Sequence, residues 1–109
     1  MNQPKRRKPD YELSGKQRGA LRALAHHLTP LVQVGKDGVT EGVVLAAEEA
    51  LALHELIKVR VLESAPAPRA EIAAPLALAA GAHLVGQVGR IVILYRMHEE
   101  KPTVELPKR

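Results

Sequence analysis

The sequence predicts an α/β domain in which helices pack on a mixed four-stranded β-sheet. Apolar residues recur at helical spacing in three segments, and they alternate or run together in four shorter segments. These segments follow one another in the order α-β-α-β-α-β-β, which is typical of helices layered on a sheet. At 109 residues the chain has room for a single compact domain and short tails.

The first helix is expected to start at Ser14 and to end before Pro30. Ser14 and Gln17 have the spacing of a capping box, which marks a helix start, and a proline ends a helix. Apolar residues then recur at intervals of three and four, as they do on one face of a helix. This predicted buried face consists of Leu21, Leu24, Ala25 and Leu28.

A short apolar run over residues 31–34 predicts the first strand, which leads into a loop of two glycines around a charged pair. Thr40 can cap a second helix that continues to about Glu55 and buries Val43, Ala47, Ala50 and Leu51. Because this helix is acidic, we expect it to face away from any nucleic acid. Its acidic residues are Glu41, Glu48, Glu49 and Glu55.

Residues 57–61 predict the second strand, because apolar residues alternate there with Lys58 and Arg60. Such a strand has one buried face and one face in water. The alanine-rich residues 69–80, followed by a glycine, predict the third helix. Pro75 lies inside that pattern, so we expect a kink there or a helix that begins later.

The last two strands are predicted over residues 83–88 and 91–97. They flank Gly89-Arg90, a two-residue connection with glycine first that suits a type II′ hairpin. Apolar residues occupy both faces of the second of these strands, so it is expected in the interior of the sheet.

The composition excludes several classes of protein. With no cysteine, the chain has no disulfide scaffold, thiolate metal site or cysteine nucleophile. No apolar run is long enough for a membrane span or a secretion signal, so we expect a cytoplasmic protein without membrane contact. Phe and Trp are absent and there are only two Tyr, which argues against the base-stacking platforms of RNA recognition motifs and OB folds.

The charge of the chain points to a polyanionic partner. The formal net charge is +4 and the isoelectric point is about 9.7. Residues 1–38 hold eight Lys and Arg against three acidic residues, so the basic character lies in the N-terminal third. We expect residues 1–10, which include the run Lys5-Arg6-Arg7-Lys8, to be a disordered basic tail that contacts polyanions. The domain then covers residues 11–98, and residues 99–109 form a polar tail.

The loop Gly35-Lys36-Asp37-Gly38 is the first candidate binding site. Glycines let backbone N–H groups approach a phosphate closely, the following helix start adds partial positive charge, and Lys36 adds a full one. The nearest mechanical analogy is the GXXG clamp of KH domains, since the spacings of P-loops and of dinucleotide folds are missing. The alternative is that this segment is only a turn.

The first helix and the second strand supply further candidates. No acidic residue lies between Ser14 and Leu28, whereas an ordinary solvated helix mixes both signs of charge. A row of phosphates could therefore align along its basic residues. The candidates on this helix are Lys16, Arg18, Arg22 and His26. Lys58 and Arg60 on the second strand are candidates for extending the same surface, and the alternative is that they only keep that face soluble.

Histidines raise the alternative of an RNA-cleaving enzyme. The candidates for acid and base are His26, His27 and His54. Adjacent histidines on a helix point about 100° apart, and no carboxylate stands at a spacing that would orient either of them. We therefore expect no catalytic residue, no metal, no cofactor and no small-molecule substrate.

Five stretches, in order, resemble the YhbY-type or CRM-domain RNA-binding proteins. They are LSGKQR (13–18), LAHHL (24–28), VGKDGVTE (34–41), HELIKV (54–59) and VILYR (92–96). The resemblance implies a fold similar to the C-terminal domain of translation initiation factor three. It also implies a role in maturing the large (50S) ribosomal subunit, with precursor ribosomal RNA and the pre-50S particle as partners. By the same resemblance, the RNA-facing residues are the loop 35–38 and the basic helix beside it.

Two other functions stay open beside this one. The chain could be a protein-interaction module that docks on a ribosomal protein or a GTPase through its sheet or its acidic second helix. It could also bind structured RNA outside the ribosome.

Overall fold

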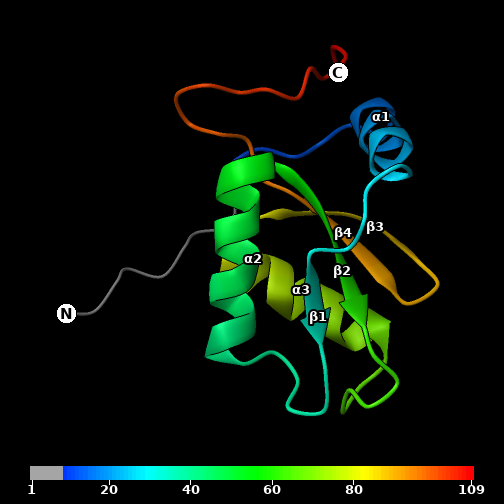
Figure 1. Cartoon of the computed structure of the whole chain (residues 1–109). Coiled ribbons are helices and arrows are strands. Elements are labelled where there is room, and N and C mark those ends of the chain that lie inside the picture. Colours follow the sequence, from blue (N-terminus) through cyan, green and yellow to red (C-terminus); the bar gives the residue numbers. More distant parts are fainter. Residues whose placement is uncertain (1–8) are drawn as a thin grey trace.

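Residues 9–109 of the computed structural model contain the helices and strands that the sequence predicts, in the predicted order (Figure 1). The basic run 5–8 lies outside the described residues. Within the described part, no helix is long and apolar enough to cross a membrane. The elements are α1 (Gly15–Ala25), β1 (Val32–Val34), α2 (Glu41–His54), β2 (Leu56–Val61), α3 (Arg69–Ala80), β3 (His83–Val88) and β4 (Ile91–Tyr95).

The four strands form one mixed sheet in the order β1-β2-β4-β3. β1 runs parallel to β2, while β4 is antiparallel to both of its neighbours. β4 is therefore an interior strand, as its apolar character on both faces predicts. The register between β3 and β4 shifts between Leu84 and Gly86, which marks a bulge in β3.

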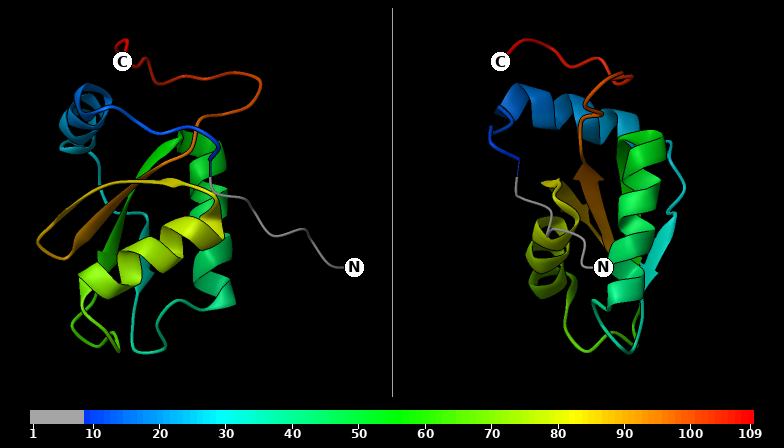
Figure 2. Two further views of the ribbon diagram at one scale, coloured as in Figure 1. Left: turned by 180° about the vertical axis from the view of Figure 1, so that it is seen from behind. Right: turned by 90° about the vertical axis from the view of Figure 1, so that its left-hand side faces the viewer.

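Two apolar clusters lie on opposite faces of the sheet. On one face α2 and α3 bury a large cluster that includes Leu51, Leu76 and Val59. On the other face α1 lies across one end of the sheet, as Figure 2 shows, and buries a smaller cluster that includes Leu21 and Tyr95. Because α1 covers only one end, the rest of this face has no helix over it.

The first helix is shorter than the sequence predicts. The capping box is confirmed, since the Gln17 N–H donates to Ser14 Oγ and the Gln17 side chain accepts from the Ser14 N–H, both at 3.1 Å. The helix ends at Ala25, so Leu24 is 48% exposed and Leu28 39% exposed. The predicted apolar face of four residues is therefore wrong, because only Leu21 and Ala25 are buried where α1 crosses the sheet.

The third helix runs through its proline. It starts at Arg69, where the alanine-rich pattern begins, so the expected later start is wrong. Pro75 has no N–H for the Glu71 carbonyl, four residues earlier. Both residues are exposed, so that carbonyl can accept a hydrogen bond from water instead. Gly81 then ends the helix with a φ of +66°, a conformation that glycine adopts readily.

Glu55 is buried, although it looks like a surface acid in the sequence. It follows α2 with a φ of +60° and is only 2% exposed. Its carboxylate accepts hydrogen bonds from the backbone N–H groups of His98 (2.6 Å), Thr103 (2.7 Å) and Val104 (2.7 Å) and from the Thr103 hydroxyl (2.7 Å). Including Glu55 in the exposed acidic surface of the second helix is therefore wrong.

These hydrogen bonds control the ionisation of Glu55. Burial by itself would raise the pKa of its carboxyl group, since a charge is disfavoured away from water. The ionised carboxylate accepts hydrogen bonds from the Thr103 hydroxyl and from the backbone N–H groups of His98, Thr103 and Val104. They outweigh the burial and lower the pKa of Glu55 to about 2.

The C-terminal segment 98–109, which includes the predicted polar tail 99–109, folds back onto α1 (Figure 1). Val104 and Leu106 pack against the smaller apolar cluster. The Gln17 side chain donates to the Pro107 carbonyl at 3.1 Å, and Arg109 donates to the carbonyl of Glu12. The two apolar residues at alternating positions are the signal in the sequence that could have indicated this packing.

Candidate nucleic-acid interface

The loop 35–38 is a tight turn between β1 and α2. The Gly38 N–H donates to the Gly35 carbonyl at 3.0 Å, and Gly38 has a φ of +72°. Gly38 is also buried, and a Cβ there would lie 3.1 Å from Cγ of Pro66. Glycine is therefore required at this position by the fold itself, whatever the loop binds.

The loop presents one cation at the start of α2. Lys36 and Asp37 are both exposed, and the Val43 N–H donates to the Thr40 hydroxyl at 3.1 Å to cap the helix. The helix start carries partial positive charge, but Glu41 in the first turn offsets part of it. The acids Asp37 and Glu41 both follow Lys36 closely in the chain and offset its charge. The loop therefore needs further cations nearby to hold a polyanion strongly.

The basic residues of α1 have different surroundings. Arg18 donates to the Leu84 carbonyl and so fastens α1 to β3. Lys16 is exposed in the first turn of the helix. His26 caps the end of α1, and its ring meets the edge of His27 with centroids 5.3 Å apart. Arg18 is half-buried, whereas Lys16 and Arg22 are exposed on the helix.

Arg22 lies over β3. A Cβ on Gly86 would be 3.1 Å from Cδ of Arg22, and one on Gly19 would be 3.8 Å from Nη2. The two glycines thus leave a slot in which the arginine side chain lies. Gly86 is not among the site residues predicted from the sequence. A glycine inside a strand pattern is nevertheless a signal that another group lies close to the strand backbone.

Lys58 and Arg60 extend from β2 on the side of the sheet that α1 partly covers. Lys58 is paired with Ile93, a member of the smaller cluster, and its Nζ donates to the His26 carbonyl at 3.3 Å. Arg60 is exposed. We call the uncovered part of this side the open sheet face. It consists of Gln33, Lys58, Arg60, Gly86, Val88 and Ile91, with Arg22 lying over Gly86.

The structure divides the predicted site into two parts. α1 and the loop 35–38 lie at opposite ends of the sheet, and β1 runs between them (Figures 1 and 2). The expectation that the basic helix lies beside the loop is therefore wrong. The reason is connectivity, because α1 is joined to one end of β1 and the loop to the other. Lys58 and Arg60 of β2, the neighbour of β1, lie along the way from one to the other.

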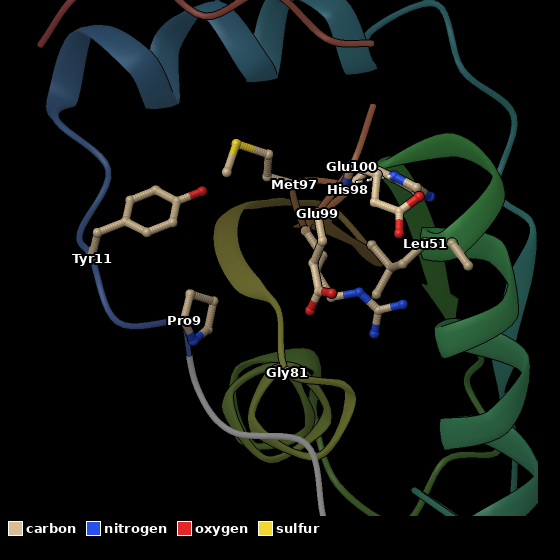
Figure 3. A pocket seen from close by; sticks show the side chains of 10 residues that line it. Pro9, Tyr11, Leu51, Gly81, Met97, His98, Glu99 and Glu100 are labelled. Carbon is tan, nitrogen blue, oxygen red and sulfur yellow. Dashed lines mark hydrogen bonds between the residues drawn. The ribbon is translucent and has the colours of Figure 1, made fainter. Parts of the chain in front are cut away.

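An open pocket of about 620 Å³ lies elsewhere on the molecule (Figure 3). Pro9 and Tyr11 line it from the N-terminal side, and residues 97–100 line it after β4. Arg96 also lines it, and its guanidinium donates to the Ala80 carbonyl at 2.8 Å and to the Glu48 carbonyl at 3.2 Å. That arginine ties the end of α3 to α2, and none of the residues that line the pocket belongs to the predicted site.

The described residues contain no cluster of side chains that could bind a metal ion. Across residues 9–109, no three His, Asp or Glu side chains lie close enough together to hold a metal ion.

Comparisons with known proteins agree on one family. The model of the CRS1/YhbY (CRM) domain matches residues 13–96, which include every helix and strand of the described structure. Over 95 residues the chain is 41% identical to the Probable RNA-binding protein YqeI of Bacillus subtilis, covering 87% of this chain and 99% of that protein. It is also 41% identical over 97 residues to a Haemophilus influenzae protein named RNA-binding protein, covering 89% and 97% of the two chains.

A solved structure has the same fold. The solution structure of a Staphylococcus aureus protein, described as a proposed RNA-binding protein, matches with a TM-score of 0.76 and 38% sequence identity. The match covers 88% of this chain and 100% of the other. The family match over residues 13–96 also includes the loop 35–38.

Proposed function

The chain belongs to the CRS1/YhbY (CRM) domain family, and from that premise we propose that it binds precursor ribosomal RNA and assists assembly of the large (50S) ribosomal subunit. The observation that carries RNA binding is the open sheet face, where Arg22, Lys58 and Arg60 lie on one side of the sheet. The sequences of α1 and of all four strands contain no acidic residue to offset them. The names of the relatives from Bacillus subtilis and Haemophilus influenzae support RNA binding.

In this proposal the protein acts by binding alone. The cations of the open sheet face hold phosphates, and Lys36 with the loop N–H groups adds contacts at one end of that face. No catalytic group, cofactor or small-molecule substrate takes part. A cytoplasmic location and the pre-50S particle as partner are parts of the same proposal.

The binding mechanism is tested by a triple variant, Arg22→Ala with Lys36→Ala and Arg60→Ala. Each phosphate contact contributes about 0.7 to 0.9 to the slope of log affinity against log salt. Loss of three contacts is therefore expected to lower that slope by about 2 to 3 and to weaken RNA binding at low salt. A filter-binding titration at several salt concentrations measures both quantities.

The matched control removes cations from elsewhere on the chain. Lys101 and Lys108 are exposed residues of the C-terminal segment, so Lys101→Ala with Lys108→Ala is expected to change affinity little. If the triple variant keeps the affinity and the salt slope of the unaltered protein, the open sheet face and the loop do not hold the RNA.

The ribosomal role is tested by a sucrose gradient of cell lysate at low salt, probed for this protein and for precursor and mature ribosomal RNA. The protein is expected to sediment with large-subunit precursors and to leave them at high salt, because its contacts are mostly ionic. The triple variant is expected at the top of the gradient. If the unaltered protein also stays at the top under low salt, its RNA partner lies outside the assembling subunit.

A second candidate function rests on α2. Leu45 is 46% exposed and Leu53 78% exposed on this acidic helix, and exposed leucines are a feature of surfaces that bind proteins. If the protein docks on a ribosomal protein or a GTPase through α2, then Leu53→Asp with Glu49→Lys abolishes that complex in a pull-down. The same variant is expected to bind naked RNA at least as tightly as before, because it makes the protein less acidic.

A further inference from the structure

We propose that the open sheet face takes a base-paired RNA stem, held through the phosphates of both strands, rather than an unpaired strand read by its bases. The inference rests on the proposed function, since it names the class of RNA that the same surface takes. It follows from how the cations are spaced, how Arg22 is held, and which side chains the face lacks.

The cations lie on both sides of an aliphatic strip, with Lys58 and Arg60 on one side and Arg22 alone on the other. Lys58 is paired with Ile93 on β4, and Ile93 is paired with Gly86 on β3, over which Arg22 lies. The backbones under Lys58 and Arg22 are therefore two strand spacings apart, about 10 Å. Arg60 continues the row of Lys58 along β2. A duplex offers two phosphate rows to such a surface, whereas an extended single strand offers one.

Arg22 is placed in advance for this contact. Its stem lies against Gly86 and its guanidinium end lies near Gly19, so the side chain has a defined path over the sheet. The Arg22 side chain is exposed, and its guanidinium makes no hydrogen bond or ion pair with the described residues. A cation held in position without a protein counter-charge binds a phosphate with a smaller loss of conformational entropy.

The acidic residue that follows β2 does not compete for these cations. Glu63 is ion-paired with Arg90 at 3.0 Å, beyond the end of the strand where the hairpin turns. The strands themselves carry no acid, so no strand residue offsets the positive charge of Lys58 and Arg60.

The open sheet face also has no aromatic ring on which an unpaired base could stack. The aromatic rings of the strands are those of His83 and Tyr95, which are 7% and 1% exposed. They stack on each other with centroids 6.0 Å apart, and Tyr95 is buried in the smaller apolar cluster at the end of this side that α1 covers. The uncharged side chains that remain on the face are Gln33, Val88 and Ile91. Many proteins that hold unpaired RNA stack its bases on such rings, so a face without them suits an RNA whose bases stay stacked on one another.

A base-paired stem matches what the face does offer. Stems of A-form RNA present phosphates and 2′-hydroxyl groups across a shallow minor groove, and proteins recognise them by shape without unstacking a base. Gln33, which lies beside Arg60 in the register of β1 and β2, can exchange hydrogen bonds with a 2′-hydroxyl. The basic side chains on either side of the aliphatic strip then contact the two backbones.

The test uses the full chain and fluorescence anisotropy with three probes of one sequence. They are an RNA hairpin stem of about 16 base pairs, one of its strands alone, and the corresponding DNA duplex. The RNA stem is expected to bind at least about tenfold more tightly than either other probe. Arg22→Ala and Arg60→Ala are each expected to lower the salt slope for the stem by about 1.

A backbone variant isolates the slot under Arg22. Gly86→Ala places a methyl group 3.1 Å from Cδ of Arg22 and so displaces that side chain while keeping its charge. We expect it to weaken stem binding, but less than Arg22→Ala does, because the side chain is shifted and its charge remains. Circular dichroism checks that the variant is folded, and Arg60→Ala tests the other row independently if it is not. Lys101→Ala, in the C-terminal segment, is the matched control.

The possible outcomes separate this inference from the proposed function. If the single strand binds as tightly as the stem and Arg60 is still needed, the protein binds RNA but the stem assignment is wrong. Equal binding of the DNA duplex also overturns the assignment to RNA stems. If no RNA probe binds, the proposed function itself fails.

Discussion

Glu55 is a single residue on which a whole segment depends. Its carboxylate accepts four hydrogen bonds from residues 98–104, and it is held in a backbone conformation that residues other than glycine rarely adopt. A buried charge is stable only where donors replace the water it loses, and here all four donors come from the end of the chain. The attachment of the C-terminal segment is therefore linked to the ionisation of one carboxyl group.

Acid is expected to weaken the fold through Glu55. Its pKa is about 2 in the folded protein and about 4.5 when unfolded, so the folded state favours the ionised form. The resulting stabilisation, about 3 kcal/mol, is fully present above pH 4.5 and is lost as the pH falls toward 2. Urea unfolding at several pH values measures it.

The control for this pH dependence is the variant Glu55→Gln. A glutamine cannot ionise and points an NH₂ group at backbone donors, so we expect it to cost about 2 to 4 kcal/mol at neutral pH. Its stability is expected to change less between pH 5 and pH 3 than that of the unaltered protein. The exposed Glu105→Gln is the matched substitution, and equal effects of the two would show that Glu55 holds nothing.

The two glycines of the loop 35–38 are expected to respond differently to substitution. Gly38→Ala places a Cβ 3.1 Å from Pro66 at a φ of +72°, so it is expected to lower stability by about 1 to 2 kcal/mol. A Cβ on Gly35 meets only ordinary contacts, at 3.8 Å from Leu62 and 3.9 Å from Ser64. Gly35→Ala therefore leaves the melting temperature nearly unchanged, and a loss of RNA affinity in this variant reports close approach of the RNA to the loop backbone. Unchanged affinity would mean that the loop is only a turn.

At the scale of elements, the C-terminal segment 98–109 contains no helix or strand, but it completes the packing of the smaller apolar cluster. Val104 and Leu106 cover the smaller apolar cluster beside α1, and Glu55 fixes the backbone between β4 and these two residues. The segment and the carboxylate thus act as a unit, and removing either one disables the other.

This coupling predicts that their effects on stability are not additive. Deleting residues 98–109 is expected to destabilise the domain and to increase binding of a hydrophobic dye, since the smaller cluster loses its cover. Adding Glu55→Gln to the truncated chain is expected to cost far less than it does in the full chain, because the donors are already gone. Chemical denaturation of the four proteins completes the cycle, and additive losses would contradict the coupling.

The sequence predicts the helices and strands better than it predicts which distant parts of the chain lie next to each other. The order of helices and strands, the interior position of β4 and the cap at Ser14 are confirmed, because each follows from local spacing or from apolar content. The burial of Glu55 depends on residues more than forty positions away, and no local pattern shows it. The separation of α1 from the loop follows from chain order, because α1 precedes β1 and the loop follows it, so the resemblance and not the order of elements led to the wrong expectation.

At the scale of the whole molecule, the two sides of the sheet differ. One side is closed by α2 and α3 over the larger apolar cluster, and the other is closed by α1 and the C-terminal segment at one end only. A surface without helical cover remains on the second side, and it carries Lys58 and Arg60. The side covered by α2 and α3 contains the larger apolar cluster and stabilises the fold, while the open sheet face on the other side is accessible to a ligand.

RNA is therefore expected to perturb one side of the molecule. In an NMR titration with an RNA stem, the amide signals of Gln33, Arg60 and Gly86 are expected to shift. The signal of Leu78, which is 57% exposed on α3, is expected to stay in place. Shifts that centre on α2 or α3 instead would place the ligand on the closed side.

The position of β4 in the sheet has a consequence for how the protein is made. β4 joins β2 to β3, yet it is the last strand to be synthesised. While the ribosome translates the chain at roughly 5 to 20 residues per second, β1 and β2 can pair, but the sheet lacks its central strand and Glu55 lacks its donors. Both apolar clusters therefore stay incomplete in the nascent chain until β4 and the donors to Glu55 that follow it have been translated.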